Sequence, residues 1–469
     1  MSRTQPPLRA AVVGTGHRAR LFTHALATRP AYRVAALCDP SPTRMAFHNR
    51  LLAEAGAPPA AQWDPGRFTE MLEREDISEV VVTTVDSAHD HYIVPALRAG
   101  CRVVTEKPMT VDATRCARIL DAVRTTDGSL TVAFNYRFDP VHATVRRLLA
   151  EGAVGEVLSV HFEWLLDVRH GADYFRRWHR DKRHSGGLLV HKAGHHFDLV
   201  NWWLGDEPAE VFGYGRLGFY GRAAGERHGL RRPYIRAHRA PEAADDPFAL
   251  HLAADDTLRA LYLDAEGDDG YVRDRNVFDD AVTIDDDMAV LVRYARGATM
   301  TYHLTAYSPW EGYRVMVNGS AGRLELEVEE SRWQPPVPAG AGGGGAGHGE
   351  RAAAHAGGVR LTLRPLWQPP AELPVRAAHE AHGGADPRML AALFGPAPGP
   401  APAPDGPGPA PDGCTPAPDA RHPDAPYPAP TAGARDGALA LAVGLAADQA
   451  CATGRPVAVR DVVPSLWSR

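Results

Sequence analysis

The stretch LLVHKAGHHFDLVNWWLG at residues 188–205 places proton-transferring side chains in an otherwise apolar run. On a helix, His191, His195 and Asp198 are spaced at i, i+4 and i+7, so they share one stripe, and Lys192 begins the neighbouring stripe. A histidine that a partner holds in place can act as a general base. The pattern therefore predicts a proton-transfer site with His195 as the base.

A metal site and a purely structural role are the two alternatives for this stretch. His191 and His195 have the spacing of the H-E-x-x-H zinc motif, but Lys192 stands where that motif has glutamate and would repel the ion. No third ligand is evident, so we expect no metal. In the structural alternative, buried polar groups satisfy one another at a domain interface.

A glycine turn near the N-terminus predicts a dinucleotide site. Gly14, Gly16 and Ala19 have G-x-G-x-x-A spacing directly after a strand and at the start of a helix, where backbone and helix N-terminus can hold a pyrophosphate. The next strand ends at Asp39, which can accept hydrogen bonds from both hydroxyls of an adenosine ribose. An aspartate repels a 2′-phosphate and favours NAD, although Arg44 could still reach the phosphate of NADP.

Glu106 and Lys107 follow another apolar strand, in VVTEKPMT. The carboxyl ends of parallel strands gather ligands in doubly wound folds, so we assign both residues to the cofactor site. A lysine there could also donate a hydrogen bond to a substrate hydroxyl and lower its pKa. The alternative is a solvated Glu-Lys pair.

Alternating strands and helices position these residues. The apolar runs LRAAVVG, YRVAALCD, EVVVTT, CRVVTEK and LTVAFNY alternate with helical stretches at 19–28, 42–55 and 112–125. Such alternation predicts an α/β fold with a doubly wound parallel sheet, a Rossmann domain, over residues 1–140.

After residue 140 the apolar residues alternate with period two, as in SVHFEWLLDV, which predicts a mostly antiparallel sheet in an α/β substrate and oligomerisation domain. We assign that domain to residues 141–334, 359–395 and 432–469. The segments 335–358 and 396–431 are rich in Gly, Ala and Pro, and we expect disordered insertions.

Composition limits the possible classes of protein. The 469 residues are 44% hydrophobic and 23% charged with a net charge of −6, which is typical of a soluble protein without a nucleic-acid or membrane partner. The five cysteines are scattered, which fits a reducing compartment. The N-terminus runs directly into a strand, and we expect a cytoplasmic protein.

The motifs GTGHRA, LCDP, TEKPMT and NYRFDP, in this order and spacing, resemble the Gfo/Idh/MocA dehydrogenases. The resemblance covers nearly the whole chain. It implies a Rossmann domain, a second domain on a large open sheet, and a substrate between them. It also implies that Lys107 assists hydride transfer between NAD(P) and a sugar or cyclitol hydroxyl, and that the chain forms homo-oligomers on the open sheet.

Alignment of HHFD with this family makes His195 match its catalytic histidine and Asp198 its later aspartate. His191 then stands where many members have aspartate, so the usual Lys-Asp-His arrangement is altered. We assign Lys107, His195 and His191 to catalysis and Arg137, Lys192 and Asp198 to substrate binding. Lys192 could favour an anionic substrate such as a uronate.

These features predict an NAD-dependent oxidoreductase that acts on a secondary hydroxyl of a sugar, sugar acid or cyclitol. One alternative is a glycosidase or lyase that keeps NAD tightly bound through a cycle of oxidation and elimination. Another is a non-catalytic NAD-bound sensor. The basic run DYFRRWHRDKRHSGG is either a solvated face or a lip over the substrate pocket that grips a carboxylate or phosphate.

Overall fold

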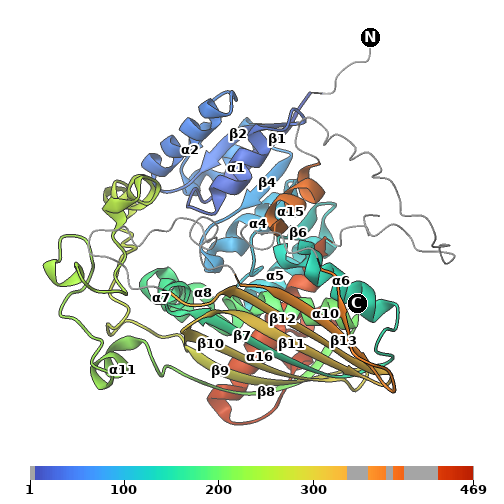
Figure 1. The fold of residues 1–469 in the computed structure, drawn as a ribbon. Helices are drawn as coiled ribbons and strands as arrows, with labels where there is room; N and C mark the ends of the chain where they lie inside the picture. Colours follow the sequence, from blue (N-terminus) through green and yellow to red (C-terminus); the bar gives the residue numbers. More distant parts are fainter. Residues whose placement is uncertain (1–5, 335–356, 376–383, 396–430, 468–469) are drawn as a thin grey trace, which may run out of the picture.

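Two sheets organise the chain, and the first lies above the second in Figure 1. The computed structural model describes residues 6–334, 357–375, 384–395 and 431–467. The two low-complexity segments therefore fall outside the described residues, apart from residues 357–358 and 431 at their ends.

The first sheet has the strand order β15-β6-β5-β4-β1-β2-β3 and is parallel except for β15. Its strands are β1 (Leu8–Val13), β2 (Tyr32–Cys38), β3 (Ala61–Trp63), β4 (Glu79–Val82), β5 (Arg102–Thr105), β6 (Ser129–Val132) and β15 (Ala432–Gly433). Its helices are α1 (Ala19–Ala27), α2 (Pro42–Glu54), α3 (Phe68–Arg74), α4 (His89–Arg98) and α5 (Ala113–Thr125). The five expected strands and three expected helices are confirmed.

Both faces of this sheet are covered, as its continuous apolar strands predict. Val12 of β1 packs in a buried cluster with Phe22 of α1, whereas its neighbour Val13 packs in a second cluster with Ile93 of α4. Local capping fixes the helix starts. The Ser41 side chain accepts from the backbone N–H of Arg44 at the start of α2, and Asp112 does the same for Arg115 at α5.

The second sheet has the order β14-β13-β12-β11-β7-β10-β9-β8-β16, and only its β7–β10 pair is parallel. The mostly antiparallel sheet is confirmed. Its strands are β7 (Val157–Asp167), β8 (Pro208–Arg216), β9 (Asp287–Tyr294), β10 (Thr299–Ser308), β11 (Glu311–Gly319), β12 (Gly322–Ser331), β13 (Val359–Pro365), β14 (Ala371–Leu373) and β16 (Val457–Ala458).

Helices cover one face of the second sheet. The helices α10 (Ala193–Leu204) and α16 (Ala434–Thr453) pack on each other, and α16 packs on β8 (Figure 1). The remaining helices of this half are α6 (Pro140–Ala150), α7 (Val168–Arg176), α8 (Lys182–Ser185), α9 (Leu188–His191), α11 (Gly221–Arg227), α12 (Asp256–Leu258), α13 (Glu266–Asp269) and α17 (Val459–Val462).

Two elements correct the expected domain boundaries. Helix α15 (Ala385–Phe394), which we placed in the second domain, packs on the first sheet, because Met389 and Phe394 are buried in the cluster that contains Phe22. Arg102 Nη2 also donates to the carbonyl oxygen of Leu393 at 2.8 Å. Strand β15 pairs with β6 of the first sheet. Segments late in the chain therefore complete the first domain.

Residues 217–286 connect β8 to β9, and we call them the connecting segment. They fold into short helical pieces, including α11, α12, α13 and the π-helical turn η7 (Arg259–Leu263). In Figure 1 the yellow-green part of this segment reaches the first domain beside α2, and η7 contacts α2. The sequence pattern did not predict this contact.

Candidate active site

Lys107, Asp86 and His191 lie together where the two domains meet. Lys107 follows β5, Asp86 lies in the 3-10 turn η2 (Asp86–Ala88) after β4, and His191 ends α9. Lys107 Nζ donates to the carbonyl oxygen of His191 at 3.4 Å, and His191 Nδ1 lies 2.5 Å from Asp86 Oδ2. Asp86 and His191 are both buried. The Lys107–Pro108 bond is cis.

Burial and neighbouring charges determine the protonation of this cluster. Burial and then the Lys107 ammonium hold the pKa of His191 well below its usual value, so its ring is neutral at pH 7. Burial raises the pKa of Asp86, and Lys107 opposes that shift. Burial lowers the pKa of Lys107, and Glu106 and then Asp86 oppose that shift. An ionised Asp86 would accept from Nδ1–H and leave Nε2 of His191 as the basic atom.

Asp86 therefore places a carboxylate beside His191, the residue that stands where many members of the resembling family have aspartate. The sequence pattern does not point to Asp86, because its partner lies 105 residues further along the chain. The only available signal was its place just after an apolar strand, since such strand ends gather ligands.

His195 and Lys192 contact Tyr136, which follows β6 in the turn η3 (Asn135–Phe138). The rings of His195 and Tyr136 stack with centroids 4.3 Å apart. Lys192 Nζ donates to the Tyr136 hydroxyl at 3.0 Å and lies 4.5 Å from the ring centroid of Trp164. Burial lowers the pKa of Lys192 to about 8, although Glu311 and Glu330 oppose that shift. The assigned roles of both residues stay predictions.

Lys192→Met should flatten the pH dependence of stability between about pH 8 and pH 10.5, the folded pKa and the ordinary value. In this window the unfolded chain binds more protons than the folded one, so the Lys192 contribution to stability rises with pH. The free energy of unfolding, measured in urea across this window, should rise more steeply for the native protein than for the variant. Lys182→Met, at a side chain that is 42% exposed, is the control. If the free energy of unfolding rose equally with pH in the native protein and in K192M, the lowered pKa of Lys192 would be contradicted.

Arg137 and Asp198, which we assigned to substrate binding, form a buried ion pair. Arg137 Nε and Nη2 donate to Asp198 Oδ2 and Oδ1 at 2.7 and 2.6 Å, and Nη2 also donates to Asp436 Oδ1 at 3.0 Å. Both Arg137 and Asp198 are buried. These ion pairs join η3 to α10 and α16. The substrate-binding role of Arg137 and Asp198 stays a prediction.

The stripe of His191, His195 and Asp198 contacts residues of the first domain along its length. The helix divides into α9 and α10 at Lys192. His191 contacts Asp86, His195 stacks on Tyr136 and Asp198 pairs with Arg137, so the three side chains have three different partners. The first of these contacts lies beside Lys107, whose Nζ donates to the carbonyl oxygen of His191.

The glycine turn fits a dinucleotide. Gly14 has φ +82°, and a Cβ there would lie 2.7 Å from the backbone of Thr84, so only glycine allows this approach. Ala19 begins α1 and is fully buried, as the fingerprint predicts. Asp39 follows β2, and its carboxylate accepts from the backbone N–H of Thr15 at 2.6 Å and of Ser41 at 2.8 Å. An acidic group therefore stands at the strand end that the ribose would approach.

Arg44 and Glu106 are both held by ion pairs. Arg44 Nη2 donates to Asp39 Oδ1 at 3.0 Å and also pairs with Asp269 of the connecting segment. Glu106 Oε1 accepts from Arg18 Nε at 2.5 Å, and Arg18 pairs in turn with Asp386 of α15. A direct contact between Glu106 and a cofactor stays a prediction.

The basic run is neither one solvated face nor one lip. Arg176 and Arg180 are buried and donate to the carbonyl oxygens of Phe248 and Ala281, so they hold the connecting segment in place. The Arg183 side chain is 86% exposed. His179, which is also buried, lies with its ring centroid 4.3 Å from that of His191. The charge run was visible in the sequence, but its partners were not.

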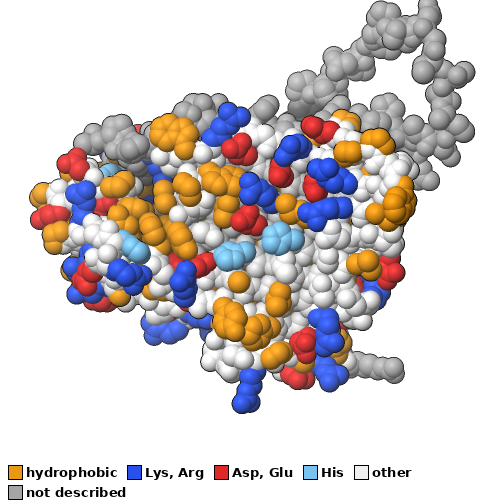
Figure 2. Space-filling view, turned by 60° about the horizontal axis from the view of Figure 1, so that its bottom comes forward, with side chains coloured by type: hydrophobic (Ala, Val, Ile, Leu, Met, Phe, Trp, Pro, Cys, Tyr) orange, Lys and Arg blue, Asp and Glu red, His pale blue; other side chains and the backbone are white. Residues whose placement is uncertain are grey.

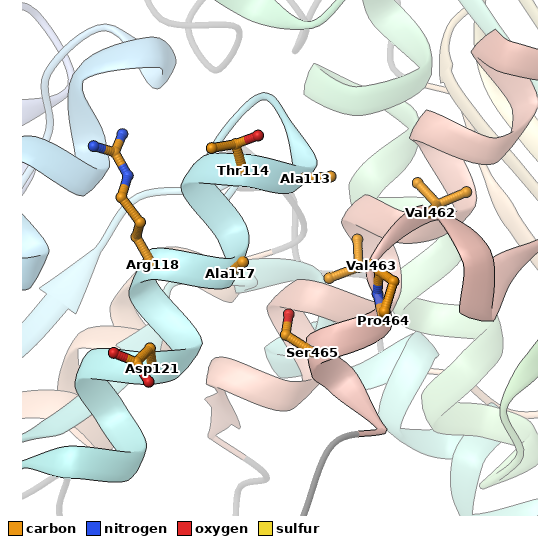
Figure 3. A pocket seen from close by; sticks show the side chains of 9 residues that line it. All are labelled: Ala113, Thr114, Ala117, Arg118, Asp121, Val462, Val463, Pro464 and Ser465. Carbon is orange, nitrogen blue, oxygen red and sulfur yellow. The ribbon is translucent and has the colours of Figure 1, made fainter.

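A separate pocket lies between α5 and the C-terminal turn, and its lining includes Arg118, Asp121 and Pro464 (Figure 3). It involves no element of the Lys107 cluster. Within the described ranges, no group of three or more His, Cys, Asp or Glu side chains is placed to hold a metal ion. In the same ranges, no helix is long and apolar enough to cross a bilayer.

The sheet topology brings the candidate groups to one edge. Strands β1, β4 and β5 are parallel neighbours, so their carboxyl ends place the glycine turn, Asp86 and Lys107 side by side. This arrangement is that of a nicotinamide-dependent oxidoreductase with a second domain completing the site.

Family models agree with that class. The model for the NAD-binding Rossmann fold of the GFO/IDH/MocA oxidoreductase family matches residues 8–134, and the model for its C-terminal alpha/beta domain matches residues 146–348. The chain belongs to this family. The expected oxidoreductase acting on CH–OH groups is thereby confirmed at the level of the family.

The matches to individual relatives cover different fractions of the chain. The putative oxidoreductase YteT of Bacillus subtilis is 33% identical over 382 residues, which are 77% of this chain and 82% of that protein. Inositol 2-dehydrogenase of Rhizobium meliloti is 30% identical over 205 residues, 44% of this chain and 57% of that protein.

Solved structures share the fold. Levoglucosan dehydrogenase in complex with NADH and levoglucosan has a TM-score of 0.58 at 15% identity, over 97% of this chain and 99% of that one. Aldose-aldose oxidoreductase from Caulobacter crescentus has a TM-score of 0.58 at 18% identity, over 96% and 99%.

Proposed function

We propose that the chain is an NAD-dependent oxidoreductase that acts on a secondary hydroxyl of a sugar, sugar acid or cyclitol. The observation that carries this proposal is the Lys107, His191 and Asp86 cluster at the same sheet edge as the glycine turn. Relatives named as inositol and levoglucosan dehydrogenases support the substrate class.

Different residues of the chain would bind the cofactor, stabilise the substrate oxygen and accept the hydroxyl proton. The glycine turn and Asp39 would hold the dinucleotide, which supplies the hydride acceptor when bound. Lys107 would donate to the substrate oxygen and stabilise its negative charge. The geometry favours His191 as the group that takes the hydroxyl proton, because it lies beside Lys107 and a carboxylate holds its Nδ1. His195, which the family resemblance favours, is the second candidate.

Asp86→Asn should lower kcat by about 10²-fold or more, since the positioned base is lost. An asparagine cannot stabilise the charged imidazole, so the acidic limb of the kcat profile should move to lower pH. Affinity for NAD should stay nearly constant. His195→Asn is the matched comparison. If H195N abolishes turnover and D86N leaves both kcat and its pH profile intact, the base is His195.

An assay of purified protein with a panel of sugars, sugar acids and cyclitols tests the function. Net NADH formation with one member of the panel would support the proposal. No turnover across the panel by a protein that binds NAD would contradict it and favour the non-catalytic sensor.

A glycosidase or lyase that retains its NAD is a second candidate. The His191 and Asp86 pair favours it, because elimination next to an oxidised hydroxyl needs a base to remove a proton from carbon. Product formation without net NADH would identify it in the same assay.

We further propose a cytoplasmic homo-oligomer that uses the open face of the second sheet. Tyr214 of β8 and Leu291 of β9 point away from its helices and are 68% and 52% exposed. Figure 2 shows hydrophobic side chains among charged ones on the lower side of the molecule. The described cysteines are free thiols, in keeping with a reducing compartment.

A further inference from the structure

Part of the connecting segment lies on the dinucleotide turn rather than on the sheet to which it belongs. The hydroxyl of Tyr262 in η7 accepts a hydrogen bond from the backbone N–H of His17 at 3.0 Å. A Cβ on Gly16 would lie 3.6 Å from the same hydroxyl. Backbone N–H groups of such a turn bind phosphate oxygens. The segment therefore reaches the phosphate end of the candidate cofactor site.

Two acidic residues of the same segment reach the adenosine end. The Ser41 hydroxyl donates to Asp268 Oδ2 at 2.5 Å, and the backbone N–H of Thr43 donates to the same oxygen at 3.1 Å. Asp269 pairs with Arg44. All three contacted residues lie at the start of α2, directly after Asp39.

Apolar packing anchors this part of the chain. Leu258, Leu261 and Tyr262 are buried in a small cluster, and Phe47 of α2 packs against it. The guanidinium of Arg273 lies 4.5 Å from the ring centroid of Tyr262 and pairs with Asp173 of α7. The acidic pair is thus held on the Rossmann domain by a packed element.

We propose that residues 256–273 are an additional wall of the dinucleotide site and that Asp268 and Asp269 select NAD over NADP. This inference rests on the proposed use of a nicotinamide dinucleotide. Its new element is that the selecting charges come from the second domain, far from the fingerprint in sequence.

The physical reason is the balance of charge around the adenosine ribose. Asp39, Asp268 and Asp269 bring three carboxylates to this corner, and Arg44 is already paired with two of them. A 2′-phosphate carries up to about two negative charges and needs a cation, which Arg44 can no longer offer alone. A ribose hydroxyl donates hydrogen bonds, so carboxylates favour it.

The test is the double variant Asp268→Asn/Asp269→Asn, with NADH and NADPH binding to the full chain measured by titration without any sugar. The ratio of the NADPH Kd to the NADH Kd should fall by about tenfold or more, which corresponds to about 1.4 kcal/mol. Asn keeps an oxygen that can accept from Ser41 and Thr43. If the double variant does not fold, the single variant Asp269→Asn takes its place in the experiment. It should shift the ratio of the NADPH Kd to the NADH Kd in the same direction.

The matched control is Asp256→Asn/Asp264→Asn, which removes two charges from exposed positions of the same segment. Its Kd ratio should equal that of the native protein. Equal ratios in both double variants, or a loss of affinity by the same factor for both dinucleotides, would overturn the inference. Native protein that binds neither dinucleotide would instead contradict the proposed function.

Discussion

Lys107→Ala should lower kcat by about 10³-fold, in the upper part of the range for general acid–base catalysis, while the affinity for NAD stays nearly unchanged. The Lys107 ammonium donates to the carbonyl oxygen of His191, whose ring contacts Asp86. Its loss removes the charge that would stabilise the substrate oxygen as its proton leaves.

Two further variants make this result interpretable. Lys107→Arg keeps the charge but not its position, and it should also be severely impaired, because a planar guanidinium cannot replace a compact ammonium. Lys182→Ala changes an ion pair with Asp448 outside the cluster and should keep full turnover. Unchanged kcat in K107A, measured with the substrate found in the panel, would refute the assignment.

Arg137→Met should destabilise the folded protein by about 3–5 kcal/mol, because Asp198 would then be a buried charge without its partner. The double variant R137M/D198L should recover most of this loss, because neither charge then needs solvation. Denaturant unfolding of the native protein and both variants measures the effect. Reduced substrate affinity with unchanged stability would instead support the substrate-binding role.

The loss of folding stability in R137M should depend on pH. Burial already raises the pKa of Asp198 to about 6 against the opposing effect of Arg137, and without Arg137 this pKa should rise further. A folded pKa above the unfolded one means that the folded state binds more protons. Stability therefore falls as pH rises between the two values. The variant should be more destabilised at pH 8 than at pH 5.

Local sequence determined the first domain. The continuous apolar strands could be buried only in a covered parallel sheet, and Ser41 and Asp112 cap the helices that follow them. Gly14 and Asp39 follow strand ends, so their placement at the carboxyl edge was predictable from the chain order alone. Lys107 was predictable for the same reason.

Helical periodicity alone could not assign partners within the stretch at residues 188–205. A period places side chains on a face, but it does not say what packs against that face. Asp86 contacts His191, and Arg137 pairs with Asp198. Both partners lie on elements that are distant in the sequence. These contacts depend on tertiary packing, which helical periodicity does not encode.

The tertiary structure alone placed α15 on the first sheet and residues 256–273 on the dinucleotide turn. Their polar contacts, Arg102 with Leu393 and His17 with Tyr262, join residues 291 and 245 positions apart. No local propensity encodes such pairs, because they form only when burial of apolar surface brings distant segments together. The sequence by itself determined the Rossmann domain and its lysine, and the packing of the second domain decided what surrounds them.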